Sequence, residues 1–204
     1  ASVTDANVGT TNYKFGEASL PIAVSDPNEH TTTFDYYEKT EPDGKNPAGL
    51  LRLQTDPAGN STEYTYNERG QVLSETRRTA ADSRTSITRY EYYAGTSPDG
   101  RPGDLRRLYQ PQCAICQSID LPLPPRLPTF ATEYTYDANG NTRTESQLRT
   151  IRIPGTGANG AQVEVEVQER IVNETLCDPA NRTIGTIRRR ALLDAAGAVV
   201  AGSE

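Results

Sequence analysis

The sequence is poor in the residues that usually build a hydrophobic core. Its 204 residues include no Trp, no Met and only three Phe, and hydrophobic residues make up 34% of the chain. Globular domains typically contain about 45–50% apolar residues. A thick core between packed layers is therefore hard to build. A thin repeated sheet needs less apolar material, because each unit buries its face against the next unit.

Basic patches and long apolar runs are equally scarce. The formal net charge is −6, and the short basic run at residues 188–190 is expected to be a solvated strand end. No stretch approaches the roughly 20 apolar residues that a membrane-spanning helix needs. Charge and hydropathy therefore predict neither a nucleic-acid partner nor membrane insertion.

Cysteine is limited to Cys113, Cys116 and Cys177. Gln117 follows the Cys-x-x-Cys pair where a haem-attachment motif has His, and the proline-dense residues beyond it cannot form the helix of a thioredoxin site. Three Cys and the single His30 lack the usual spacing of zinc ligands. We favour an extracellular disulfide, either within the pair or from one member to Cys177. Reduced thiols and a metal site are the alternatives.

No catalytic motif is present. The chain lacks a Gly-x-Ser-x-Gly elbow and a phosphate-binding loop. Its single His30 occupies a turn position where a related segment has Asn60. The carboxylates recur at turn positions, where capping of backbone amides explains them, and no alternating Asp loop for calcium appears. We predict no enzyme activity, no catalytic residue, no cofactor and no metal site.

What the sequence does contain is a repeat. Segments 26–36 and 56–66 align without a gap, each with Asp-Pro at its start and two aromatic residues, two positions apart, at its end. Segments 82–92 and 126–136 keep the aromatic pair, and a weaker copy begins at Asp178. Self-similarity of this kind indicates one supersecondary unit used repeatedly. Disorder is the alternative for so polar a chain, but disordered tails lack such strand-like alternation.

Each part of the repeat has a physical role. Pro57 presets φ at the second position of a turn, and Gly59 accepts a positive φ. Tyr64 and Tyr66 project from one face of a strand. A second turn follows, with Gly70 in the left-handed region. One unit is therefore predicted to be a β-hairpin. The residues expected to carry the repeat are Asp26, Pro27, Phe34, Tyr36, Asp56, Pro57, Gly59, Tyr64, Tyr66, Gly70, Asp82, Tyr90, Tyr92, Tyr134, Tyr136, Asp137 and Gly140.

The repeat divides the chain into four segments. Residues 1–19 are expected to be irregular or an edge strand, and residues 20–93 to form repeat hairpins. Residues 94–129 are a Pro/Gly-rich insertion with the Cys-x-x-Cys pair, and residues 130–204 continue the sheet. Strict alternation over 163–167 predicts a strand with one buried and one acidic face. The predicted fold is all-β, with consecutive antiparallel hairpins in a curved or spiralling sheet that is open at both ends.

Three of these motifs resemble a known family. They are Tyr-x-Tyr-Asp-x-x-Gly-Asn at residues 134–141, Tyr-Thr-Tyr-Asn-Glu-Arg-Gly at residues 64–70 and Asp-Pro-Ala-Gly-Asn at residues 56–60. They are similar to the tyrosine–aspartate (YD) repeats of the rearrangement-hotspot (Rhs) family. The resemblance covers most of residues 20–150 and extends loosely over 161–200.

The resemblance implies a long sheet that spirals into a hollow shell. Such shells enclose a cytotoxic polypeptide in polymorphic toxins and insecticidal toxin complexes, and a related shell in teneurins takes part in cell-surface adhesion. In toxin members, an aspartyl self-cleavage region with a terminal Asp-Pro-x-Gly-Leu signature ends the shell. Here Asn60 follows Asp56-Pro57-Ala58-Gly59, so no catalytic residue is transferred.

A few hairpins cannot close a shell alone. Because the chain starts at Ala1 and contains no Met, we interpret it as a processed product or an excerpt. Its expected partners are neighbouring copies of itself or the rest of a longer repeat array, since a contact that does not close generates a filament. We predict a non-catalytic structural module in the wall of an extracellular shell or fibre. The alternative is a cell-surface adhesion module that recognises glycans or a protein receptor.

Overall fold

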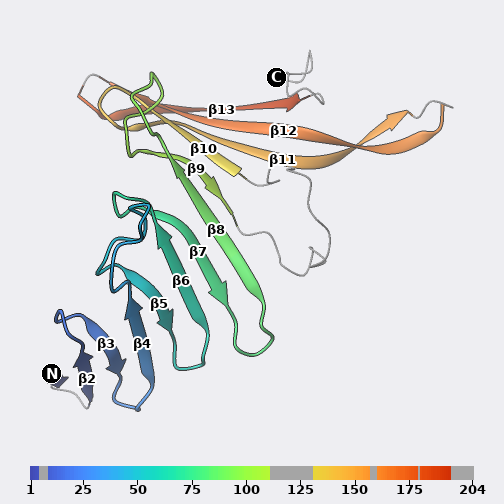
Figure 1. Cartoon of the computed structure of the whole chain (residues 1–204). Helices are drawn as coiled ribbons and strands as arrows, with labels where there is room; N and C mark the ends of the chain where they lie inside the picture. The colour runs from blue at the N-terminus through green and yellow to red at the C-terminus, as the bar shows by residue number, and fades with distance from the viewer. Residues whose placement is uncertain (5–8, 111–130, 157–159, 179, 194–204) are drawn as a thin grey trace. The chain divides into compact units, whose positions relative to one another are not determined.

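The computed structural model describes residues 1–4, 9–110, 131–156, 160–178 and 180–193. Within these ranges every regular element is a strand, and thirteen strands lie in one open sheet (Figure 1). Their order across the sheet is their order in the chain, from β1 to β13. The predicted all-β fold of consecutive antiparallel hairpins is thus confirmed for the described part of the chain.

The sheet falls into two units with a boundary after Arg89. The first unit holds seven strands and the beginning of an eighth. They are β1 (Ser2–Thr4), β2 (Thr10–Phe15), β3 (Pro21–Ser25), β4 (Thr31–Tyr36), β5 (Leu51–Thr55), β6 (Ser61–Tyr66), β7 (Val72–Arg78) and β8 (Thr85–Tyr92).

The register of the first unit places its aromatic residues on one face. Tyr13 lies opposite Val24, Phe34 lies opposite Gln54, and Tyr64 lies opposite Glu75. Intervening pairs keep these positions on the same side, because residues two apart on a strand share a face. We call this side the aromatic face. It is the side that the alternation of tyrosine and threonine in the sequence predicts.

The opposite side of the first unit is rich in hydroxyl groups. Thr33 pairs with Thr55, and Thr55 pairs with Ser61. Across the β3–β4 turn, the hydroxyls of Ser25 and Thr31 are 2.7 Å apart. β-Branched threonine suits an extended backbone, and its hydroxyl binds a neighbour or water. This side therefore does not need a second layer to cover it.

A register shift recurs where hairpins begin to turn. It follows Lys14, Asp35 and Thr65 in the first unit, and Thr135 and Leu176 in the second. At Thr65 the partners jump from Ser74 to Val72, so Leu73 is left without an opposite residue. Such bulges increase the local twist of a sheet. Tyr36, Tyr66 and Tyr136 each follow one of these shifts.

The second unit holds the end of β8 and five further strands. They are β9 (Leu105–Tyr109), β10 (Ala131–Tyr136), β11 (Thr142–Thr156), β12 (Gln162–Cys177) and β13 (Thr183–Leu193). β11 and β12 form a long hairpin whose register runs without interruption from Thr144↔Glu174 to Thr156↔Gln162. The alternating residues 163–167 lie in β12, as the pattern predicts.

One segment differs from its sequence-based assignment. Residues 94–129 were expected to be an insertion, but Leu105–Tyr109 forms β9 and pairs with β10. Leu105-Arg-Arg-Leu-Tyr109 takes the place that Leu51–Thr55 takes in the first unit. The strand was not predicted from the sequence, because it contains no copy of the repeat motif and directly follows a Pro- and Gly-rich turn.

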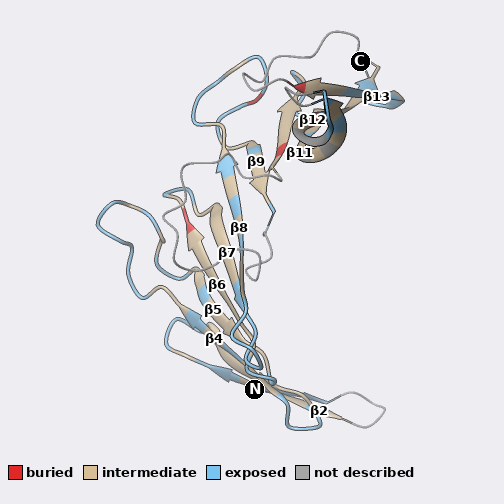
Figure 2. Cartoon of the chain, turned by 90° about the vertical axis from the view of Figure 1, so that its right-hand side faces the viewer, coloured by how far each residue is buried: buried red, intermediate tan, exposed pale blue. Residues whose placement is uncertain are grey.

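Very little of either unit is fully buried. The buried apolar residues are Tyr66, Ile171 and Leu193, at 8%, 4% and 4% exposure, and no described side chain is less than 2% exposed. Most of the strands are coloured as half-buried in Figure 2. This pattern is that of a single sheet layer, and it agrees with the low apolar content.

A substitution at Gly70 tests whether this turn requires a residue with positive φ. Its φ is +75°, and an added Cβ would meet the Leu50 Cδ1 atom at 3.4 Å. A β-branched residue strongly resists this region. We expect Gly70→Val to lower the free energy of unfolding by about 1–2 kcal/mol or more, as measured by urea denaturation.

Gly95→Val is the matched control, because Gly95 has nothing within 4 Å of its added Cβ and no positive φ. Its effect should lie within about 0.5 kcal/mol. Equal stability of the two variants would mean that the turn does not require glycine.

Candidate functional site: aspartate turns and tyrosine clasps

One five-residue turn, which we call the aspartate turn, recurs between strands. In the copy that starts at Asp137, the Asp137 amide donates to the Asn141 carbonyl at 2.9 Å, and the Gly140 amide donates to the Asp137 carbonyl at 3.1 Å. The Asp137 Oδ1 atom accepts the amides of Asn139 and Asn141 at 2.8 and 2.9 Å. The Asn141 side chain donates to Oδ2 at 2.9 Å. The remaining copies start at Asp26, Asp56, Asn67 and Asp178.

The fourth residue of each aspartate turn has a positive φ. Gly59, Gly70 and Gly140 supply it, as the sequence predicts, with φ of 83°, 75° and 90°. Glu29 and Asn181 occupy the same position with φ of 66° and 61°. A non-glycine residue is uncommon there. The hydrogen bonds of the turn hold the chain in this conformation even where glycine is missing.

Asp82 lies at a different place in its turn from the predicted one. The turn opens at Thr79, whose amide donates to the Arg84 carbonyl at 3.0 Å. The Asp82 Oδ1 atom accepts the Thr79 hydroxyl at 2.6 Å and the Arg84 amide at 3.1 Å. The carboxylate therefore closes the turn from within. The spacing from Asp82 to Tyr90 matches the other copies, but the turn is longer by one residue.

His30 takes the fifth position of the first aspartate turn. Its Nδ1 atom lies 3.1 Å from the Asp26 Oδ2 atom, where Asn60 and Asn141 place a side-chain amide in their own turns. This agrees with the sequence-based view of His30 as a turn residue.

Hydrogen bonds lower the pKa of the turn carboxyls. The Asn60 side chain, and then its backbone amide, hold the pKa of Asp56 below its ordinary value of 3.8. The Asn141 side chain and backbone amide do the same to the pKa of Asp137. These carboxylates are ionised at neutral pH, which makes them strong acceptors for backbone amides.

A pair of tyrosines, which we call clasp 1, fixes the loop between β4 and β5. The Tyr37 hydroxyl donates to the Tyr64 carbonyl at 2.9 Å, and the Tyr66 hydroxyl donates to the Leu51 carbonyl at 2.8 Å. The rings of Tyr37 and Tyr66 meet edge to face, with centroids 6.3 Å apart. From the loop, Asn46 accepts the Tyr66 amide on Oδ1 at 2.7 Å.

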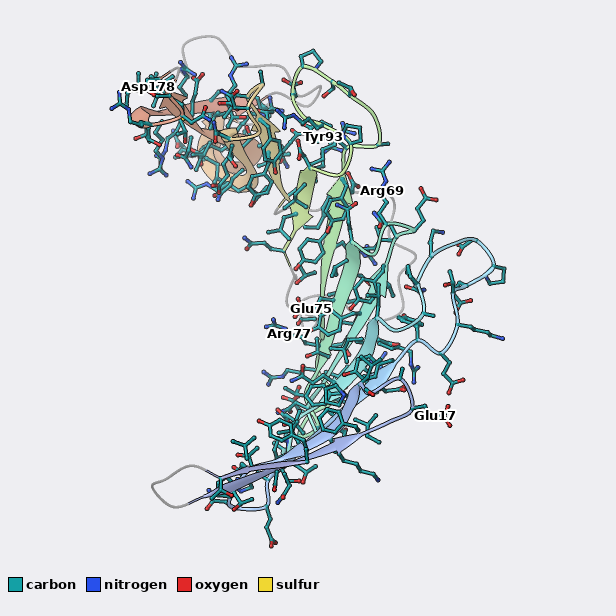
Figure 3. All side chains as sticks on the ribbon, turned by 90° about the vertical axis from the view of Figure 1, so that its left-hand side faces the viewer. Glu17, Arg69, Glu75, Arg77, Tyr93 and Asp178 are labelled. Atoms are coloured by element: carbon teal, nitrogen blue, oxygen red, sulfur yellow. The ribbon has the colours of Figure 1, made fainter. Side chains whose placement is uncertain are left out.

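The second unit repeats this arrangement as clasp 2. The Tyr93 hydroxyl donates to the Tyr134 carbonyl, and the Tyr136 hydroxyl donates to the Leu105 carbonyl, both at 2.9 Å. The two rings are again edge to face, 6.5 Å apart. Tyr93 lies where the chain leaves β8 and enters the loop (Figure 3). The Arg106 guanidinium lies 5.8 Å from the centre of its ring.

The bases of the two loops match as well. In clasp 1 the Tyr37 amide donates to the Leu50 carbonyl, and in clasp 2 the Tyr93 amide donates to the Asp104 carbonyl. Burial raises the pKa of the clasp phenols above 10.0. They therefore stay protonated and donate hydrogen bonds at neutral pH. The clasps can position loops, and they offer no nucleophile or base.

The roles of Tyr37 and Tyr93 were missed at the sequence level. Each is the second residue of a Tyr-Tyr pair, at 36–37 and at 92–93. That recurring pair was the available signal. The first residue of the earlier pair, Tyr36, donates its hydroxyl to the Pro21 carbonyl at 2.9 Å. The predicted Tyr64, Tyr66, Tyr134 and Tyr136 all contribute an atom to a clasp.

The aspartate turns also bind to neighbouring turns within a unit. Asn60 Oδ1 accepts the Ala80 amide at 3.1 Å. In the second unit, the Asn139 side chain donates to Asn181 Oδ1 at 2.7 Å. The latter bond joins turns that are 42 residues apart in the chain. In each unit, two turns that follow one another along the same edge of the sheet are therefore linked.

The remaining predicted site residues are placed as follows. Cys113 and Cys116 lie outside the described residues. Cys177 ends β12 as a half-buried thiol that forms no disulfide within the described residues, and the disulfide stays a prediction. Among the described residues, no group of three His, Cys, Asp or Glu side chains is placed to hold a metal ion. The described residues contain no helix that could span a membrane.

Charged side chains pair along and across the strands. Arg77 Nε lies 2.5 Å from Glu75 Oε1 on the same face of β7 (Figure 3). Arg107 Nη2 lies 2.9 Å from Glu133 across the β9–β10 pair. At least one side chain of each pair is substantially open to solvent, so each pair contributes little stability. Their arrangement is that of a solvated sheet surface.

Comparison with known proteins identifies part of this arrangement. The sequence model of the RHS Repeat family matches residues 46–85. Residues 46–85 are an RHS repeat. The repeat extends from Asn46 of clasp 1 through β5, β6 and β7 to the start of β8. It contains two aspartate turns, at Asp56 and Asn67. The resemblance to the Rhs family that the sequence indicated is thereby confirmed.

Three solved structures are among those to which the chain is similar. One is a Tc holotoxin pore of Photorhabdus luminescens with a mutated TccC3, at 12% identity and a TM-score of 0.45, over 93% of this chain. The others are crystal structures of TcdB2-TccC3-TEV and TcdB2-TccC3-Cdc42, at 12% and 13% identity, TM-scores of 0.46 and 0.43, and 89% and 91% coverage. The chain covers 9% of the length of each. No curated protein sequence matches it.

Tyrosine-to-phenylalanine changes test the clasps. Tyr37→Phe and Tyr93→Phe each remove one hydroxyl-to-carbonyl bond and keep the ring. We expect each to lower the free energy of unfolding by about 1 kcal/mol. Tyr13→Phe is the control and should be near neutral, because the Tyr13 hydroxyl forms no hydrogen bond with a described residue. Equal effects at all three positions would contradict the clasp interpretation.

The turn carboxylates predict a pH dependence. A folded-state pKa below the ordinary 3.8 means that the stabilisation is fully present above about pH 4 and is lost as the pH falls through the lower folded value. Asp137→Asn should keep the turn, as Asn67 does naturally, but should flatten the fall of the melting temperature below pH 4. An unchanged acid profile in this variant would contradict the assignment.

Proposed function

We propose that the chain is a non-catalytic structural module in the wall of an extracellular shell or fibre. The observation that carries this proposal is the pairing order of the sheet, in which every strand lies beside its neighbours in sequence. Proteins built this way are stabilised by contacts between adjacent units and need no central core. The RHS repeat at residues 46–85 supports the same function.

The open edges define the proposed partners. Within the described residues, β1 pairs only with β2, and β13 pairs only with β12. Unpaired backbone groups at a sheet edge attract further strands. The partners that we propose are neighbouring copies of the chain or the rest of a longer repeat array. An extracellular or cell-surface location follows from the proposed wall function.

An adhesion module that binds glycans or a receptor through tyrosines is the alternative. The clasp geometry favours the wall instead. Tyr36, Tyr37, Tyr66, Tyr93 and Tyr136 all donate their hydroxyls to backbone carbonyls of the same chain. Those donors are already used within the sheet, so they are not available to a sugar without breaking it.

Assembly of the purified chain tests the proposal. Sedimentation velocity and negative-stain electron microscopy should show species that grow with concentration as sheet edges join. Val3→Lys should reduce this growth, because Val3 is 62% exposed on the edge strand β1 and lysine discourages edge pairing.

Ala18→Lys adds the same charge in the exposed turn between β2 and β3 and should leave assembly unchanged. A compact monomer at every concentration, or growth that Val3→Lys does not alter, would contradict the proposal.

A further inference from the structure

The three strands at the end of the second unit alternate in charge. β12 carries the carboxylates Glu169 and Glu174, and arginines of both adjacent strands form ion pairs with them. Arg149 of β11 pairs with Glu169, and Arg189 of β13 lies 2.7 Å from Glu174. Arg143 of β11 lies 4.0 Å from the same Glu174. An acidic strand is thus held between two basic strands, as cross-strand pairing favours.

Arg188 and Arg190 of β13 take no part in these ion pairs, and Glu169, which shares a face with Arg190, is already paired with Arg149. Arg188 lies opposite Asn173, and Arg190 lies opposite Ile171. These two arginines share the face opposite to that of Arg189, since residues two apart on a strand point the same way. Neither forms an ion pair with a described residue, whereas Arg189 does. Their guanidinium groups are therefore exposed to solvent, and no carboxylate of the described residues neutralises their charge.

The same stretch of β13 is exposed along its length. Ile184 is 67% exposed and Ile187 is 37% exposed, which is unusual for residues of this size on a strand. Ile184 is also left without an opposite residue, because the register shifts from Leu176↔Gly185 to Cys177↔Thr183. The two exposed isoleucines lie in β13 itself, before its arginines, and within the described residues this strand pairs on one side only. This combination suits a partner that supplies both apolar contacts and carboxylates.

We propose that the edge of β13 from Ile184 to Arg190 is an interaction surface for an acidic β-strand of a partner polypeptide. The partner strand carries Glu or Asp at alternate positions, which face Arg188 and Arg190, and β-branched residues between them. Backbone hydrogen bonds provide the affinity of such strand addition, and the side chains select the strand. The inference deepens the proposed wall function and rests on its premise that strands add at open edges.

The natural probe is the acidic strand of the chain itself. The peptide Gln-Val-Glu-Val-Glu-Val-Gln-Glu, which is the sequence of residues 162–169, alternates carboxylates with valines. It is compared with a peptide in which each Glu is Gln and one in which each Glu is Lys. Binding is measured by fluorescence anisotropy at several salt concentrations. Amide hydrogen exchange locates the site on the intact chain.

The acidic peptide is expected to slow exchange of the amides between Ile184 and Arg190 and to bind more weakly as salt rises. Arg188→Glu/Arg190→Glu should weaken this binding about tenfold, because two attractive cross-strand pairs become repulsive. The lysine peptide should instead prefer the charge-reversed variant. Lys39→Glu/Arg69→Glu makes the same change in net charge at exposed positions of the first unit, and should bind the acidic peptide almost as the parent does.

Three results would overturn the proposal. One is that the parent binds the acidic and the neutral peptide equally well and that charge reversal changes neither affinity. Another is protection located away from β13. The third is no binding of any peptide, which would make the arginines a device that protects the edge against pairing. Assembly of the parent is measured separately without peptide. Loss of the wall function would appear as a parent that does not assemble, whereas failure of this edge preference would appear only in the peptide binding.

Discussion

Side-chain oxygens that accept backbone amides in the aspartate turns form the interaction on which the rest of the structure depends. In a single sheet layer no second layer presses the hairpins together, so each turn must be fixed by its own bonds. Asp137 shows how this is done, with one oxygen on the amides of Asn139 and Asn141 and the other on a side chain. Once the turns are fixed, the strands have only one register available.

The tyrosine clasps solve a second problem, which is the placement of longer loops. The loops after β4 and β8 are too long to be fixed by a five-residue turn. In both, a phenol from the start of the loop binds a carbonyl of the strand two places further along. The hydroxyl thus ties the start of the loop to a strand carbonyl, while the ring packs edge to face against a strand tyrosine. The close match of the clasps makes β4–β5–β6 and β8–β9–β10 two copies of one design.

Sequence reasoning predicted the parts of this design that have a local signature. Alternation of tyrosine with threonine gave the strands, and the glycines at 59, 70 and 140 gave the turns. It missed Glu29 and Asn181, because their backbone conformation is set by hydrogen bonds and not by residue type. It also missed β9, whose pairing depends on β10 beyond an intervening segment. The partner of a hydroxyl, such as the Tyr64 carbonyl for Tyr37, depends on tertiary geometry that no short pattern encodes.

The strictly sequential strand order has a mechanical consequence. When force is applied to the two ends of such a sheet, the outermost strand can peel away while every inner pair stays intact, because no strand is clamped between distant parts of the chain. The load then falls on a few hydrogen bonds at a time, as in a zipper, and extension proceeds in hairpin-sized steps. A wall of this kind can be unravelled from a free end, so whatever covers that end governs the force that the wall withstands.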